Sequence, residues 1–303
     1  MNQIYSWSIF IICLSAFSCY HKLSSEDSAL NRESIDIHGN QMLIGKCTRE
    51  RLKEKPYGDW FNKNYADYKI DTVTAEKLKT YLSQKNFLIF MGTWCGDSKR
   101  EVPRIFKILD YCGVKSGNIK LIMMDSRDSV YKQSPTHEER GLNIHRVPDL
   151  LIYSNNKEMG RIVESPVVTL EKDMLAITSG ETYTSNYKIV PFLVTQFQQK
   201  NIRDIQNNLP DIANEVKPWM YHFAELNSYG HVLMAAGEMD KAAVSFRLNA
   251  LLYPENAGVF ASLGAYYLKT GNKLLAKENC EKALKIQPDN ERAKKISDQL
   301  QNN

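Results

Sequence analysis

Short apolar runs and amphipathic segments alternate through the middle of the chain. Four runs bounded by polar turn residues predict strands of a buried sheet: 87–92, 120–125, 149–154 and 160–164. Three segments with apolar residues at helical spacing predict helices beside that sheet: 74–85, 95–109 and 169–177. This order of elements indicates an α/β domain, a central sheet flanked by helices, over residues 70–180.

A second pattern begins at residue 226 and repeats with a period of 34 residues. Pro254 and Pro288 are one period apart, and so are the small residues Gly230 and Gly264. Small residues let two antiparallel helices pack closely, and a proline ends the second helix of each pair. The pattern therefore predicts an all-α module over 222–303.

This repeat resembles the tetratricopeptide repeat, and the resemblance implies a protein partner bound by the repeats. Residues 291–300 are expected to form a polar capping helix, and residues 181–221 are expected to form connector helices. The first helix of each repeat should line the concave face of the module. We expect five exposed positions there: Asn227, His231, Ser262, Tyr266 and Lys269.

The N-terminal residues are expected to lie outside the folded domains. Residues 4–18 are mostly apolar, too short for a comfortable transmembrane helix, and end in small residues before Cys19. The segment resembles a bacterial lipoprotein signal. It predicts a signal peptide over 1–19 and export to the cell envelope, either to the periplasm or to a membrane through a lipid on Cys19. No Lys or Arg precedes the apolar run and Phe17 is bulky for its position, so an uncleaved anchor is the alternative.

Two further segments lead into the α/β domain. Residues 20–41 are rich in Ser, Asp, Glu and Asn and predict a flexible polar tether. Residues 42–69 carry aromatic residues among charges and predict a helical extension packed on the domain. Those aromatic residues are Tyr57, Trp60, Phe61, Tyr65 and Tyr68.

Composition narrows the function classes. The chain has 303 residues, of which 43% are hydrophobic, enough for two cores. The 39 Lys and Arg residues are interspersed with 35 Asp and Glu residues, so no nucleic-acid surface is expected. The six cysteines show neither a Cys-x-x-Cys pair nor zinc spacing, so we expect no metal site and no cofactor.

The most reactive position predicted is Cys95. It follows the apolar run 87–92 and precedes a predicted helix, in the sequence Trp94-Cys95-Gly96-Asp97-Ser98. A cysteine at a strand-to-helix turn lies at the positive end of the helix dipole, which favours the reactive thiolate.

These residues resemble the active site of the thioredoxin family, Trp-Cys-x-x-Cys at the same junction. A second family motif is Val147-Pro148, whose peptide bond is cis in the family and which faces the active-site cysteine. The resemblance implies a thioredoxin-like fold over residues 70–180, with Cys95 as nucleophile. It also implies that Trp94, Val147 and Pro148 contact a thiol or disulfide protein substrate.

The chain departs from the family pattern at three positions of this motif region. Ser98 replaces the second, resolving cysteine, and Asp97 adds negative charge near the thiol. The family's buried acid corresponds to Ile89, and without a thiol at position 98 that acid has nothing to deprotonate. Glu101 is the nearest other carboxylate, and we expect it to be solvated.

No other cysteine is an obvious partner for Cys95. Cys112 lies 17 residues further along the same helical segment, about 25 Å at a rise of ~1.5 Å per residue, beyond disulfide reach. We expect Cys112 to be a core residue and Cys280 to be a packing residue of the repeat. The position of Cys47 cannot be read from the sequence, and His145 is expected at the surface.

Two functions therefore compete. The first is thiol–disulfide exchange through the single cysteine Cys95, beside a protein-binding repeat module. The second is a non-catalytic binding or scaffold protein with a degenerate thioredoxin fold. The motif Trp94-Cys95 with Val147-Pro148 favours exchange, and Ser98 favours the scaffold.

Overall fold

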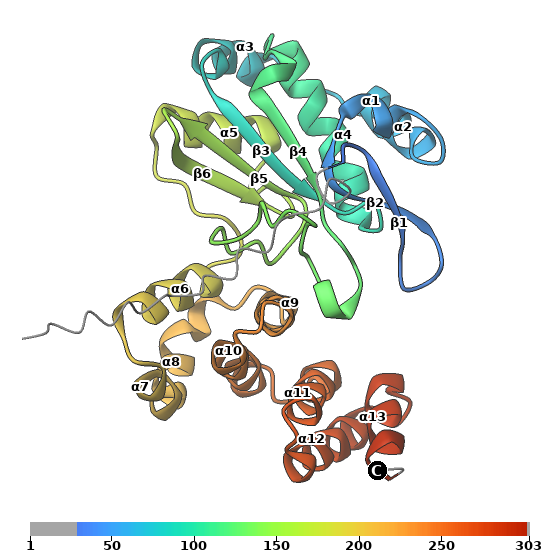
Figure 1. Cartoon of the computed structure of the whole chain (residues 1–303). Coiled ribbons are helices and arrows are strands. Elements are labelled where there is room, and N and C mark those ends of the chain that lie inside the picture. Colours follow the sequence, from blue (N-terminus) through green and yellow to red (C-terminus); the bar gives the residue numbers. More distant parts are fainter. Residues whose placement is uncertain (1–28, 302–303) are drawn as a thin grey trace, which may run out of the picture.

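The computed structural model describes residues 29–301 as an α/β domain followed by a C-terminal run of helices (Figure 1). The predicted signal segment, Cys19 and most of the predicted tether lie outside the described residues. Among residues 29–301, no helix combines the length and apolar character needed to cross a bilayer.

The domain is built on one six-stranded sheet in the order β1-β2-β4-β3-β5-β6. Strands β3 and β4 run parallel at its centre, and the other neighbours are antiparallel. Each of the four predicted strands is present within a few residues of its expected bounds. The strands are β1 Arg32–Ile35, β2 Gln41–Cys47, β3 Asn86–Met91, β4 Ile119–Met123, β5 Asp149–Ser154 and β6 Lys157–Val163.

Strands β1 and β2 correct the prediction for the N-terminal segments. They form an antiparallel hairpin, and β2 joins the sheet by pairing with β4. The predicted tether over 20–41 and helical extension over 42–69 are therefore wrong over 32–47. Met42, Leu43 and Ile44 are buried in the sheet, an apolar run too short to be recognised as a strand. The helical part of the prediction holds for α1 Arg49–Lys53 and α2 Gly58–Asp67.

The two faces of the sheet are covered differently. Alternate residues such as Ile89 and Leu121 pack against the helices of the domain in one large core. Their neighbours Phe90 and Ile122 face the other way, into a small core with residues of the segment 124–148. We call this segment the cover loop. The helices of the domain are α3 Thr72–Leu82, α4 Gly96–Tyr111 and α5 Leu170–Ser179, with the short turns η1 Ser116–Asn118 and η2 Asp128–Val130.

The C-terminal helices, here the helical module (residues 189–301), lie below the cover loop in Figure 1. Connector helices occur where they are predicted, followed by two helix pairs and a final helix. The elements are α6 Ile189–Gln199, α7 Ile202–Asn207, α8 Leu209–Val216, η3 Lys217–Trp219, α9 Ala224–Ala235, α10 Met239–Leu252, α11 Ala257–Lys269, α12 Lys273–Ile286 and α13 Glu291–Gln301.

The two helix pairs share one close contact, repeated 34 residues along the chain. A Cβ atom added at Gly230 would lie 2.7 Å from the Phe246 ring, and one added at Gly264 would lie 2.8 Å from the Cys280 Sγ atom. Glycine at these positions therefore sets how closely α9 approaches α10 and how closely α11 approaches α12.

This contact predicts the effect of Gly230→Ala. The added methyl group overlaps the Phe246 ring, so the free energy of unfolding should fall by about 1–3 kcal/mol. The measurement is urea denaturation followed by circular dichroism. Gly117→Ala is the matched control, because nothing lies within 4 Å of a Cβ atom there. Equal stability of the two variants would contradict the prediction.

Candidate functional site

Cys95 lies where the sequence places it, between β3 and α4. It is the N-cap residue of α4, a helix of 16 residues, and its side chain is partly exposed. Its Sγ atom donates to the Val147 carbonyl oxygen at 3.2 Å. The thiol therefore combines three features: partial access to solvent, the positive end of a helix dipole and a fixed backbone partner.

The Val147-Pro148 pair immediately precedes β5, and its peptide bond is cis, as predicted. Both residues are buried. The structure thus brings Cys95 into hydrogen-bond contact with Val147, although the two residues are 52 positions apart in the sequence.

The rest of the motif is fixed by local contacts. Ser98 is fully buried, and its Oγ atom accepts from the Gly92 amide at 3.3 Å. Asp97 forms an ion pair with Arg100 at 2.7 Å, so its charge near the thiol is offset. Gly96 is exposed in open space. Ile89 lies fully buried in the core.

Glu101 corrects one expectation. It was expected to be solvated, but only 4% of it is exposed. Its Oε1 atom accepts from Arg100 at 2.6 Å and from Arg104 at 3.2 Å. Two neighbouring guanidinium groups therefore allow this carboxylate of α4 to be buried.

The other three described cysteines are poor nucleophiles. Cys47, Cys112 and Cys280 are all buried, as predicted for the last two. Burial raises the pKa of Cys47 to about 12 and the pKa values of Cys112 and Cys280 to about 11. Among the cysteines of residues 29–301, Cys95 is the one that solvent reaches.

Trp94 is held by the cover loop. Its Nε1 atom donates to the Met124 carbonyl oxygen at 2.8 Å, and its ring lies 6.5 Å from the ring of Tyr131. The indole is therefore already positioned beside Cys95 by contacts within the chain.

A buried lysine next to Trp94 was not found from the sequence. Lys132 is 3% exposed, and its Nζ atom donates to the Tyr131 hydroxyl and to Ser228 Oγ, both at 2.6 Å. Ser228 Oγ in turn donates to the His145 carbonyl oxygen at 2.5 Å. No local signal could have revealed this group, because Ser228 is 96 residues from Lys132.

The electrostatics of this group are coupled. The pKa of Lys132 is lowered, because burial disfavours its charged form more than Tyr131 favours it. Burial opposes ionisation of Tyr131, but its contact with Lys132 outweighs this and lowers the pKa of the phenol. The Lys132 amine and the Tyr131 phenol therefore shift each other's ionisation next to Trp94.

His145 is buried, with 4% exposed, so the expectation of a surface histidine is wrong. Its Nδ1 atom is 3.1 Å from the Asn143 carbonyl oxygen, and its ring lies edge-on to Tyr187 and Tyr229. The pKa of His145 is lowered to about 3, mainly by burial and also by Lys132 and nearby arginines, against the opposing effect of the Asn143 hydrogen bond. The imidazole is therefore neutral at pH 7.

The helical module faces this site through α9, which packs against η2 of the cover loop. His231 lies 6.1 Å from the ring of Tyr131. Ser262 and Tyr266 are buried, so the expectation that they are exposed is wrong. Lys269 is exposed, as expected. The chain's own cover loop occupies part of the face predicted to bind a partner.

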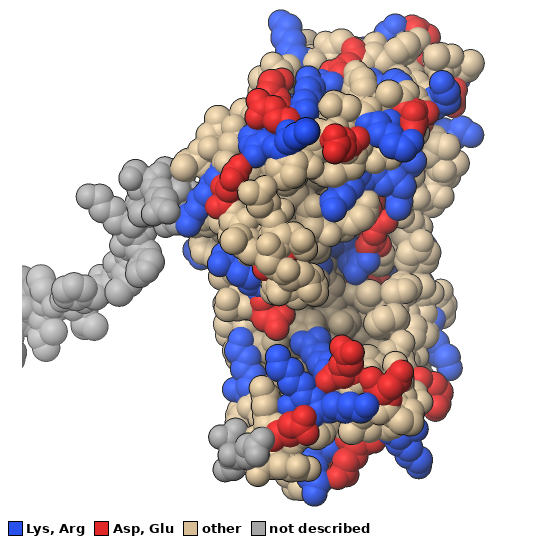
Figure 2. Space-filling model, turned by 90° about the vertical axis from the view of Figure 1, so that its right-hand side faces the viewer, with Lys and Arg blue, Asp and Glu red and all other residues tan. Residues whose placement is uncertain are grey.

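Charges of both signs are interspersed at the two ends of the face shown in Figure 2. Within residues 29–301, no three His, Cys, Asp or Glu side chains come together as a metal site would require. The arrangement supports chemistry by the thiol itself, a positioned lysine and backbone groups.

Comparisons with known proteins add one local likeness. No protein-family model and no solved structure matches the chain. Over 61 residues the chain is 43% identical to the Cell division cycle protein 27 homolog of Caenorhabditis elegans. That stretch covers 20% of this chain and 8% of the other protein. The chain therefore spans a small fraction of this relative, and the likeness concerns a short segment of each.

The neutral state of His145 predicts a pH dependence. Its pKa is about 3 in the folded protein and 6.5 ordinarily, so the unfolded chain binds the extra proton between these values. Stability from this residue is full above pH 6.5 and falls as the pH drops towards 3, by about 1.4 kcal/mol per pH unit. His145→Phe should remove this slope from the unfolding free energy measured between pH 6 and 4. The exposed residue His38, changed to Phe, is the control. Parallel curves for wild type and His145→Phe would contradict the prediction.

Proposed function

We propose that the protein is a thioredoxin-like thiol–disulfide exchange protein that acts through Cys95, with tetratricopeptide-like repeats at its C-terminus. The single observation that carries the proposal is the contact of the partly exposed Cys95 Sγ atom with the Val147 carbonyl oxygen, at 3.2 Å beside Pro148. The strand order around β3 and the glycine contacts of the helix pairs support the two fold assignments.

The proposed step is a thiolate attack on a disulfide. The Cys95 sulfur bonds to one sulfur of the substrate, the substrate S–S bond breaks, and the other substrate sulfur leaves as a thiolate. The mixed disulfide then needs a second thiol. Position 98 carries a buried hydroxyl group, and Cys47, Cys112 and Cys280 are buried, so that thiol comes from the substrate or from a small external thiol.

A substrate chain would reach Cys95 beside the partly exposed Trp94, because Val147 and Pro148 are buried in this structure. The helical module limits this space from one side, because α9 packs on the cover loop. We propose that the module helps to select the protein substrate. The predicted leader 1–19 supports action in the cell envelope, with membrane attachment only through a lipid on Cys19.

The second candidate is a non-catalytic binding protein. It is favoured by Ser98, whose hydroxyl accepts a backbone hydrogen bond in place of a resolving thiol. Capture of a partner that is unaffected by reductant and by Cys95→Ser would support this second function over exchange.

The test of exchange is an insulin-reduction assay with dithiothreitol. Ser98→Cys should raise turnover severalfold, since an internal thiol can then release the mixed disulfide, although Ile89 supplies no buried acid. Without dithiothreitol, wild type incubated with insulin should instead accumulate a mixed disulfide, which mass spectrometry detects and Cys95→Ser abolishes. Cys112→Ser is the matched control, as its thiol is buried. The proposal fails if Ser98→Cys and wild type are equally inactive and Cys95 reacts no faster than a free thiol.

A further inference from the structure

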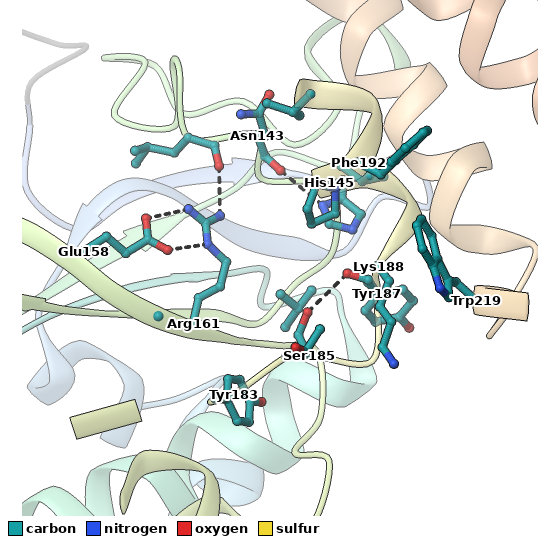
Figure 3. A pocket seen from close by; sticks show the side chains of 17 residues that line it. Asn143, His145, Glu158, Arg161, Tyr183, Ser185, Tyr187, Lys188, Phe192 and Trp219 are labelled. Carbon is teal, nitrogen blue, oxygen red and sulfur yellow. Dashed lines mark hydrogen bonds and ion pairs between the residues drawn. The ribbon is translucent and has the colours of Figure 1, made fainter. Parts of the chain in front are cut away.

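A cavity of about 550 Å³ is lined by the edge strand β6, helix α6 and the cover-loop residues Asn143 and His145 (Figure 3). Its size is that of sites for small organic molecules. Lys188 and Thr184 on its rim are exposed, which gives a path from solvent. The wall is mainly apolar and carries four aromatic side chains: Tyr183, Tyr187, Phe192 and Trp219.

One buried polar side-chain atom of the wall residues has no hydrogen-bond partner in the described structure. The Nδ1 atom of His145 faces the Asn143 carbonyl oxygen, which can only accept, so Nδ1 holds the proton. The imidazole is neutral, and Nε2 is therefore a hydrogen-bond acceptor. Nε2 is buried and has no partner among residues 29–301. A buried acceptor without a donor is unfavourable, so a donor entering the cavity would be stabilised there.

Two charged groups on the wall, Arg161 and Glu158, do not compete for such a ligand. Arg161 donates to both Glu158 oxygens at 2.7 Å, and to the Leu142 carbonyl oxygen at 2.8 Å (Figure 3). This guanidinium and this carboxylate are thus paired with each other. The third charged group, Lys188, lies at the exposed rim, and the inner wall presents apolar and aromatic surface around the His145 acceptor.

We propose that this cavity binds a neutral aromatic alcohol of the phenol or naphthol class. Its hydroxyl group donates to His145 Nε2, and its ring packs edge-on or offset against the rings of Tyr187 and Phe192. A hydrocarbon would fill the space but leave Nε2 unpaired, and an ionised carboxylate has no hydrogen to donate. The proposal does not depend on chemistry at Cys95.

The experiment compares two probes that differ in one hydrogen-bond donor. 2-Naphthol and 2-methoxynaphthalene are titrated into the full chain at pH 7, and binding is followed by probe fluorescence and by calorimetry. We expect saturable binding of 2-naphthol, about tenfold tighter than binding of 2-methoxynaphthalene, from one hydrogen bond to a buried acceptor. Absence of saturable binding, or equal affinity for the two probes, overturns the proposal.

Two variants locate the site. His145→Phe keeps an aromatic ring and should abolish the preference for the hydroxyl, whereas His38→Phe, at an exposed position, should keep it. Val194→Trp, on α6 in the cavity wall, should fill the space and weaken both probes. It also serves as the test if His145→Phe does not fold. A hydroxyl preference that survives His145→Phe, or unchanged affinity in Val194→Trp, overturns the proposal.

Discussion

The buried side chain of Lys132 links the cover loop of the α/β domain to the helical module. A polar group removed from water is costly unless it is hydrogen-bonded. The Lys132 Nζ atom donates to Tyr131 of the cover loop and to Ser228 of α9, and Ser228 donates to the His145 carbonyl oxygen. Without α9 in place, Lys132 would keep only the oxygen of its neighbour in sequence. Packing of α9 on the cover loop therefore completes the hydrogen bonds of this buried group.

The way the sheet is covered explains why contact between the cover loop and α9 matters. One face is covered by the domain's own helices in a large core, but the other carries only the cover loop, which adds residues such as Ile144 and Val147 to a small core. Within the cover loop, backbone hydrogen bonds form local turns, such as Asp125 with Gln133 and Leu142 with Glu139, and side-chain contacts hold these turns against the rest of the molecule. Packing of α9 against the cover loop supplies such contacts. Trp94 and Cys95 belong to the same small core, so the helical module supports the site indirectly.

Two buried side chains, His145 and Glu225, link the connector helices to the rest of the molecule. The His145 carbonyl oxygen accepts a hydrogen bond from Ser228, which itself accepts one from Lys132. The His145 ring forms part of the wall of the cavity beside α6. Glu225 of α9 accepts from the Ile189 and Val190 amides at 2.7 and 2.9 Å and so caps α6. Burial raises the pKa of Glu225 to about 7. Both groups thus lie at the N-terminal end of α6, where they help to set the position of this helix beside the cavity.

The sequence by itself determined the elements whose signal is local. The strands around β3, helix α4 starting after Cys95 and the helix pairs with close contacts at Gly230 and Gly264 follow from short-range patterns. The cis bond before Pro148 was implied by the family resemblance. The tertiary structure alone decided the rest. Strand β2 is stable because it pairs with β4, Glu101 is buried because two arginines flank it, and His145 and Lys132 are buried because α6 and α9 close over them. Burial of a polar side chain depends on partners distant in the chain, and local spacing carries no information about those partners.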